Sequence, residues 1–182
     1  KIKPKDCSIG TKLLHSYPVE FPDEITSISK DRAFIYGFFY GDGSCGKYDC
    51  PSGLKYSFAL NNADMSVLEN LKALIKKEYP NNEPIIYDSL SSSGVYKLSV
   101  NNPKLFVEEF RPIFYDSDKY KKVPIAILNS SVEVIQSFFD GVWASDGCRK
   151  DKETIGCTRF DTKGQIGAAG LYYLMKKEKH FI

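Results

Sequence analysis

The chain has 182 residues, a formal net charge of +2, 42% hydrophobic residues and 14% aromatic residues. Its 12 Phe and 12 Tyr supply enough apolar surface for a sizeable core, which excludes a disordered tail. No apolar run approaches the roughly 20 residues of a membrane span. Five cysteines, an odd number, argue against a secreted disulfide scaffold. We therefore expect one globular domain or two small related halves, with no membrane partner.

Residues 1–29 read as an extended lead-in or linker, because Pro4, Pro18 and Pro22 interrupt them. Residues 30–130 carry the first of two related units, whose elements follow from hydrophobic spacing, turn residues and cap residues. The predicted elements are a helix over Ser29–Asp42, strands near Cys45–Tyr48 and Leu54–Leu60, a helix over Asp64–Tyr79, a hairpin of strands Pro84–Leu90 and Gly94–Val100, and short helices over Pro103–Phe110 and Ile125–Leu128.

The second unit, residues 131–182, repeats part of this order. We expect a helix that ends at Asp146, a strand pair around Arg149–Arg159 and a helix over Lys163–Lys179. Nothing after that helix matches the hairpin of residues 84–100. The second unit is therefore truncated in this chain, genuinely reduced, or completed by another chain or by a missing C-terminal segment.

Two pairs of matched segments indicate that the units arose by tandem duplication. Ala33–Gly43 and Ser137–Gly147 are both aromatic-rich, carry an internal glycine and close on Asp-Gly. Leu60–Glu78 aligns with Phe160–Glu178, with five identical positions near the C-terminal ends of the two segments. The fold class predicted is α+β, a pseudo-twofold pair of related halves.

Small residues lie four apart on each of the two repeated helices, so both members of a pair share one helix face. Two such faces would let the helix backbones approach more closely than the usual 8–10 Å. The predicted helix interface consists of Gly37, Gly41, Gly141 and Ser145.

Close packing of these helices would bring Asp42 and Asp146 together at their C-terminal ends, with Gly43 and Gly147 in the left-handed conformation that ends a helix. Two carboxylates there repel each other and face the negative end of each helix dipole. A hard cation such as Mg²⁺ between them would remove the conflict. The alternative is that each Asp-Gly is only a turn dipeptide that ends a helix.

The paired segments resemble the two motifs of the LAGLIDADG (dodecapeptide) homing endonucleases, in the single-chain form found in inteins. The resemblance implies halves of αββαββα type, antiparallel saddle sheets that lie on DNA, and a site with Mg²⁺ or Mn²⁺ at Asp42 and Asp146, with Gly41 and Ser145 beside them. Tyr40 and Ala144 stand where the motif has an earlier acid. The matched positions are Gly37, Asp42 and Gly43 in one segment and Gly141, Asp146 and Gly147 in the other.

A Lys-x-x-Pro block of the family also has a counterpart, Lys121 to Pro124. The resemblance makes Lys121 a third catalytic residue, because a lysine near the scissile phosphate can stabilise developing negative charge. Without the resemblance, Lys119, Lys121 and Lys122 could equally form a solvated helix entry.

The resemblance further implies that strand residues track the major groove, where Lys, Arg and polar side chains make phosphate and base contacts. Basic residues exceed acidic ones after the second Asp-Gly, as a DNA-facing sheet would require. The candidate DNA-binding residues are Lys47, Lys55, Tyr56, Tyr96, Lys97, Arg149, Lys150, Lys152 and Arg159.

These observations predict a monomeric, metal-dependent endonuclease that cleaves double-stranded DNA at a long asymmetric site, as the endonuclease domain of an intein. It would act inside the cell, in the nucleus or cytoplasm depending on the host. The competing hypothesis is a non-cleaving nucleic-acid binder on the same fold, such as a maturase, a regulator or a decayed endonuclease.

Zinc binding is disfavoured because the cysteines are not tightly paired and the chain has only two histidines.

Overall fold

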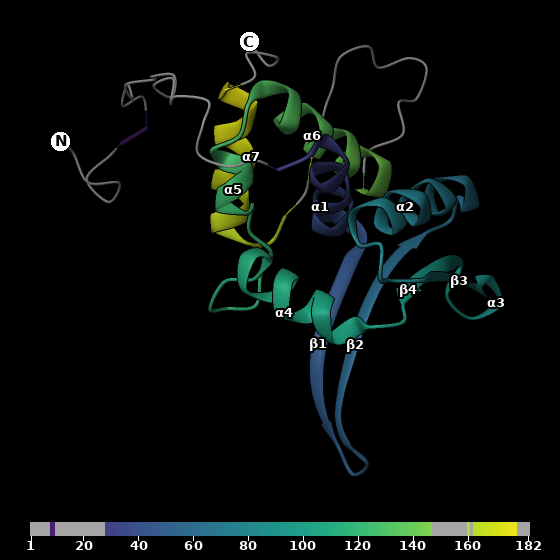
Figure 1. The fold of residues 1–182 in the computed structure, drawn as a ribbon. Coiled ribbons are helices and arrows are strands. Elements are labelled where there is room, and N and C mark those ends of the chain that lie inside the picture. Colours follow the sequence, from purple (N-terminus) through teal and green to yellow (C-terminus); the bar gives the residue numbers. More distant parts are fainter. Residues whose placement is uncertain (1–7, 10–27, 147–159, 161, 178–182) are drawn as a thin grey trace.

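The computed structural model describes residues 8–9, 28–146, 160 and 162–177, and shows helices packed against one side of an antiparallel sheet (Figure 1). The first unit contains α1 (Lys30–Asp42), β1 (Gly43–Cys50), β2 (Gly53–Asn62), α2 (Met65–Glu78), β3 (Pro84–Ser89), α3 (Leu90–Ser93), β4 (Val95–Val100), α4 (Pro103–Phe114) and α5 (Ile125–Leu128). The second unit contains α6 (Val132–Asp146) and α7 (Gln165–Lys177).

Helix α1 is the central element of the fold. It starts where the Ser29 side chain accepts a hydrogen bond from the Arg32 backbone N–H at 3.0 Å. Every residue from Ile35 to Tyr40 is buried, so the helix is enclosed on all sides instead of showing one apolar stripe. The helix leads to Asp42 at its C-terminal end, which is only partly buried.

The helices that cover the sheet follow the predicted positions, with one difference in length. The Asp64 side chain caps α2 by accepting from the Ser66 N–H at 2.9 Å. Helix α4 runs to Phe114, whereas the sequence predicted an end at Phe110. The prediction was wrong because Pro112 interrupts the pattern; Pro112 lies on the exposed side of the helix, while burial of Phe110 and Phe114 holds the last turn in place.

The sheet has the order β1-β2-β4-β3, and every pair of neighbours is antiparallel. The predicted hairpin of residues 84–100 is confirmed as β3 and β4, joined by the helical turn α3 and by Gly94 at φ 72°. Strands β1 and β2 extend well beyond the helices as a long ribbon (Figure 1).

The core lies between the helices and one face of this sheet. Phe58 and Leu98 point into it from the strands, and Phe39, Phe106 and Phe110 meet them from the helices. The Phe58 ring stacks on Phe39 with centroids 5.6 Å apart and contacts Phe106 at 4.6 Å. Burial of these large rings supplies the main stabilisation and leaves the opposite face of the sheet uncovered by any described helix.

In the second unit, α6 packs along α1, and α7 packs near α5 (Figure 1). The strand pair predicted around Arg149–Arg159 falls on residues outside those described, as does most of the lead-in of residues 1–29. Cys45, which is buried, and Cys50, which is partly buried, are free thiols. Within the described residues, no helix combines the length and the apolar character needed to cross a bilayer.

Candidate functional site

The contact between α1 and α6 depends on two glycines. A Cβ placed on Gly37 would overlap the backbone carbonyl of Phe138, and one placed on Gly141 would overlap that of Phe34. Each helix therefore rests its backbone directly on the other at these positions. The predicted close seam is present in the structure, and its reciprocal form fits an interface between two copies of one unit.

Further along the seam, Gly41 faces Ser145. A Cβ on Gly41 would overlap the Ser145 hydroxyl, which donates to the Val142 carbonyl at 2.8 Å. The seam thus stays narrow up to the C-terminal ends of both helices.

Asp42 and Asp146 are brought together where these two helices end. Burial raises the pKa of the Asp42 carboxyl, the nearby negative charge of Asp146 raises it further, and the charge of Lys121 opposes both effects. Asp42 is partly buried and Asp146 is exposed. The two carboxylates thus form a repelling pair at an accessible position, which a bound cation would stabilise.

Gly43 does not adopt the predicted left-handed conformation. Its φ is −84° and its ψ is 153°, so the chain passes straight from α1 into the extended backbone of β1. Gly43 is needed for a different reason: a Cβ there would overlap the ring and Cα of Phe39. The prediction rested on the usual way a glycine ends a helix, and it could not foresee that a strand begins at once. Gly147 lies outside the described residues.

Lys121 reaches the same place from the segment between α4 and α5. Its ammonium donates to the carbonyl oxygens of Phe39 and Gly41, each at 2.8 Å. The Phe39 carbonyl also accepts from the Gly43 N–H that closes the helix, so Lys121 is its second donor, and the Gly41 carbonyl lies in the last turn, where helix carbonyls need partners from outside. Burial lowers the pKa of Lys121 to about 8, although the charges of Asp42 and Asp146 favour its protonated form. The predicted trio of Asp42, Asp146 and Lys121 is thus gathered at one place.

The side chains at this site would supply only some of the ligands that a hard cation needs. Among the described residues, no group of three or more His, Cys, Asp and Glu side chains gathers into a metal site. Asp42 and Asp146 would supply two carboxylates, and the remaining ligands would have to be backbone carbonyls, water or a phosphate oxygen, which suits Mg²⁺. The Gly41 carbonyl already accepts from Lys121.

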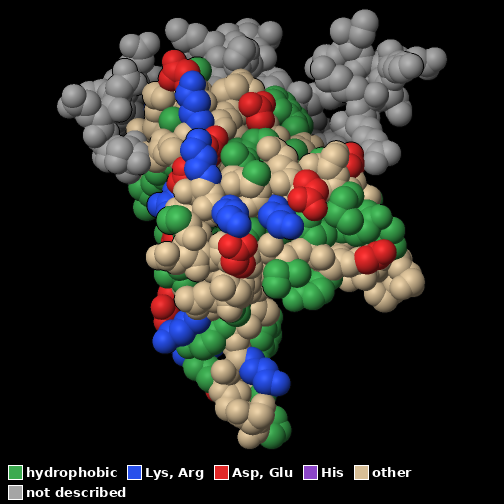
Figure 2. Space-filling view, turned by 45° about the vertical axis from the view of Figure 1, so that its right-hand side comes forward, with side chains coloured by type: hydrophobic (Ala, Val, Ile, Leu, Met, Phe, Trp, Pro, Cys, Tyr) green, Lys and Arg blue, Asp and Glu red, His purple; other side chains and the backbone are tan. Residues whose placement is uncertain are grey.

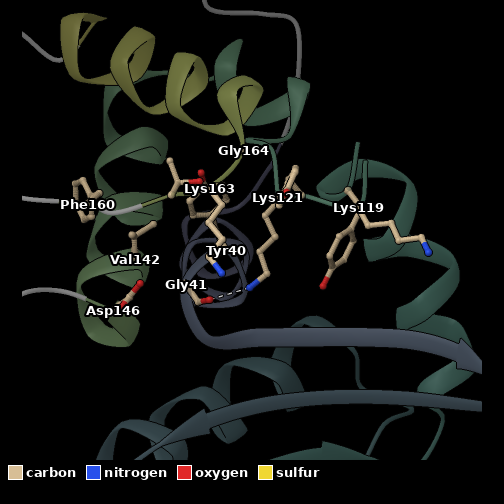
Figure 3. Close-up of a pocket in the computed structure, with 12 residues that line it drawn as sticks. Tyr40, Gly41, Lys119, Lys121, Val142, Asp146, Phe160, Lys163 and Gly164 are labelled. Carbon is tan, nitrogen blue, oxygen red and sulfur yellow. Dashed lines mark hydrogen bonds between the residues drawn. The ribbon is translucent and has the colours of Figure 1, made fainter. Parts of the chain in front are cut away.

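A cavity of about 350 Å³ opens beside this trio. Besides Gly41, Lys121 and Asp146, it is lined by Tyr40 and Lys163. Figure 3 shows the side chains of Lys121 and Lys163 both extending toward Gly41, while the Lys119 ammonium points away. Sequence reasoning missed Lys163, because a single lysine before a helix carries no signal until the fold places it beside the site.

The candidate DNA-binding residues of the first unit divide between the two faces of the sheet. Directly paired residues share a face, and Lys47 pairs with Tyr56 just beyond the pair of Cys45 with the buried Phe58. Lys47 and Tyr56 therefore lie on the helix-covered side, as does Tyr96. Lys55 and Lys97 lie on the open face. The remaining candidates, Arg149, Lys150, Lys152 and Arg159, are outside the described residues.

The open face carries a chemically distinct set of side chains. In the four described strands, both acidic residues, Asp49 and Asp88, occupy positions of the other face. The open face instead presents Lys55, Lys97, Ser44, Ser57, Asn61, Tyr48 and Tyr87. On the face of the molecule seen in Figure 2, Lys and Arg are spread from the helical end to the ribbon with Asp and Glu among them.

No protein-family model matches the chain. The chain is 48% identical over 176 residues to a DNA polymerase of Acanthamoeba polyphaga mimivirus. That match covers 96% of this chain and 10% of the polymerase, so the chain spans about a tenth of its relative.

Among solved structures, the homing endonuclease I-DmoI in complex with DNA and Mn resembles the chain with a TM-score of 0.60 and 14% identity, over 81% of this chain and 77% of that one. The complex of I-DmoI with DNA and Ca gives a TM-score of 0.58 over 81% and 71%, and mesophilic variants of I-DmoI give 0.57 over 81% and 76%. At 12–14% identity this likeness concerns the fold. The chain therefore has the mixed α/β fold, with an antiparallel sheet, of the homing endonuclease I-DmoI.

Proposed function

We propose that this protein is a metal-dependent, site-specific endonuclease of double-stranded DNA. The observation that carries the proposal is the meeting of Asp42 and Asp146 at the ends of two helices whose backbones touch. Burial and mutual repulsion disfavour this pair on its own, so its placement makes chemical sense if both carboxylates hold Mg²⁺ or Mn²⁺ against a phosphate.

The neighbouring residues suit phosphodiester hydrolysis. Water adds to phosphorus as one P–O ester bond breaks, which leaves a hydroxyl end and a phosphate end, and negative charge grows on the phosphate oxygens. A divalent cation would activate water and neutralise this charge. Lys121, fixed by two backbone carbonyls, would hold a positive charge beside the site.

The open face of the sheet supports binding to a duplex. Its lysines can contact phosphates, while its serines, asparagine and tyrosines can contact base edges, in a groove that accepts a two-stranded ribbon. The long β1–β2 ribbon (Figure 1) would extend this contact and favour a long target site. A single chain with two dissimilar halves would read an asymmetric site as a monomer.

The polymerase relative supports an intein setting. A segment of this size with an endonuclease fold matches only a tenth of a DNA polymerase, as expected if it is an insertion in the polymerase gene. The DNA site to test is then the polymerase coding sequence without the insertion, and the protein would act in the cellular compartment where that gene is copied.

A supercoiled plasmid that carries this uninterrupted coding sequence provides the test. We expect Mg²⁺-dependent nicking or linearisation that EDTA abolishes, and that Asp42→Asn and Asp146→Asn each abolish without loss of the folded structure by circular dichroism. Glu69→Gln, an exposed change on α2, serves as a matched control and should leave cleavage unchanged.

The alternative, a non-cleaving binder on the same fold, predicts another result. Such a protein would bind the plasmid sequence with the usual steep salt dependence but leave it intact at every Mg²⁺ and Mn²⁺ concentration. Cleavage that persists in both Asp→Asn variants would instead contradict the assignment of the site.

A further inference from the structure

Two cavities flank the aspartate pair, and the internal repeat relates them. The first, of about 350 Å³, is lined by Gly41 and Asp146. The second, of about 390 Å³, is lined by Asp42 and Ser145. Because Gly41 matches Ser145 and Asp42 matches Asp146 in the repeat, each cavity is the counterpart of the other, and each combines one helix end from both units.

The charges of the two cavities differ. The first contains Lys121 and Lys163 against a single carboxylate, while the ammonium of Lys119 points away, and we call it the basic pocket. The second contains Asp42 and Asp64 and, among the described residues, no lysine or arginine, and we call it the acidic pocket. On the charges of the described residues, a phosphate diester, with its negative charge, would therefore find a more favourable field in the basic pocket.

One matched position before the second helix of each unit contributes to this difference. Leu60–Glu78 aligns with Phe160–Glu178, so Ala63 in the acidic pocket is the counterpart of Lys163 in the basic pocket. The Lys163 side chain extends toward Gly41, as that of Lys121 does (Figure 3), and both lysines line the basic pocket. Asn62, which lines the acidic pocket, is bound to α6 instead, with Nδ2 donating to the Ala144 carbonyl at 3.0 Å.

We propose that the two pockets cleave the two DNA strands at unequal rates, with the strand in the basic pocket cut first and Lys163 as one of the residues that set the difference. The inference rests on the proposed endonuclease function. In each cut, water forms a bond to phosphorus, a P–O ester bond breaks and the leaving oxygen takes up a proton. Lys163 would lie near enough to stabilise the charge that develops on the phosphate.

The experiment follows a supercoiled plasmid with the uninterrupted polymerase coding sequence through time in Mg²⁺, with each strand labelled separately. The wild-type protein should accumulate nicked circles in which one strand alone is cut, before linear DNA appears. Lys163→Ala should slow the first cut by at least about tenfold, as the loss of one charge-stabilising donor does, while DNA affinity measured in EDTA changes little.

The converse variant is Ala63→Lys, at an exposed position of the acidic pocket. It should speed the second cut, so that nicked circles become short-lived. Ala73→Lys adds the same charge at an exposed position of α2 outside the pocket and should leave the ratio of the two rates unchanged, while Lys104→Ala is the matched control for the lysine deletion.

The possible results distinguish a failure of the proposed strand asymmetry from a failure of the proposed endonuclease function. Equal rates for both strands in the wild-type protein, or a first cut that Lys163→Ala leaves unchanged, would overturn the strand asymmetry and leave the endonuclease function intact. A plasmid that stays supercoiled with the wild-type protein under all metal conditions would overturn both.

Discussion

At the scale of single residues, the seam between α1 and α6 has room only for glycine at Gly37 and Gly141. Gly141→Ala would force a methyl group into the Phe34 carbonyl, and neither backbone can move without separating the helices. We expect a loss of stability at or above the roughly 1–3 kcal/mol typical of overpacking, measured as the urea-unfolding free energy. Asp140→Ala, at the exposed neighbouring position, is the control and should cost far less; equal losses would contradict the close seam.

Lys121 carries a second residue-scale prediction, on pH and stability. Its pKa in the folded protein is about 8, below its ordinary value of 10.5. Between these two values the unfolded chain binds more protons, so folding becomes more favourable as the pH rises, and the full penalty of burying the charge is present below pH 8. Lys121→Met removes this penalty and its pH dependence.

The measurement compares unfolding free energies of the wild-type protein and Lys121→Met at pH 7 and pH 9.5. The wild-type protein should gain stability relative to the variant at the higher pH. Lys122→Met, one residue away and half-buried, controls for general effects of losing a lysine. A difference that is constant with pH would show that Lys121 is not held in a desolvated position.

At the scale of elements, one carboxylate joins three helices of the first unit. The hydroxyls of Tyr36 in α1 and Tyr79 at the end of α2 both donate to Glu109 Oε1 of α4, each at 2.7 Å. Arg32 lies over the Tyr79 ring at 4.9 Å. Burial raises the pKa of both tyrosines, and the charge of Glu109 raises it further. This cluster fixes α1 against the helices that cover the sheet.

Tyr36→Phe and Tyr79→Phe should each destabilise the protein by about 1.5–3 kcal/mol, the range for a hydrogen bond to a charged group. The raised pKa of both hydroxyls in the folded protein means that the losses should be as large at pH 8.5 as at pH 7, and should shrink as the pH rises through about 10, where a tyrosine of the unfolded chain ionises. Tyr87→Phe, a half-exposed tyrosine on the open face, is the control. Losses no greater than that of the control would mean that the shared carboxylate contributes no stability.

The elements also show how much the sequence could predict. Positions four apart in two repeated segments identified both glycine faces and both aspartates, because helical periodicity and duplication are local signals. The extension of α4 past Pro112 and the extended backbone of Gly43 depend on packing against Phe39, Phe110 and other core residues, which no local pattern contains. The sequence could not predict the basic pocket for the same reason, since Lys163 and Gly41 come together only in the folded chain.

At the scale of the whole molecule, the division of charge between the two faces of the sheet determines how the protein would meet DNA. The sequence grouped Lys47 with Lys55 and Lys97 as equivalent candidates, because all three lie on strands. The register shows that only Lys55 and Lys97 share the open face. A one-residue difference in register separates these sets, since side chains alternate between faces.

Lys55→Ala and Lys97→Ala should therefore each weaken DNA binding and lower the dependence of log affinity on log salt by about one unit. Lys104→Ala, on the outer side of α4 where Lys104 pairs with Glu108, is the control and should leave the slope unchanged. Lys47→Ala should have a smaller effect than either open-face variant, although Lys47 is also exposed. Fluorescence anisotropy with a labelled duplex at several salt concentrations, in EDTA to prevent cleavage, measures all four variants. A larger loss with Lys47→Ala than with Lys55→Ala would place DNA on the helix-covered side of the ribbon and contradict the proposed orientation.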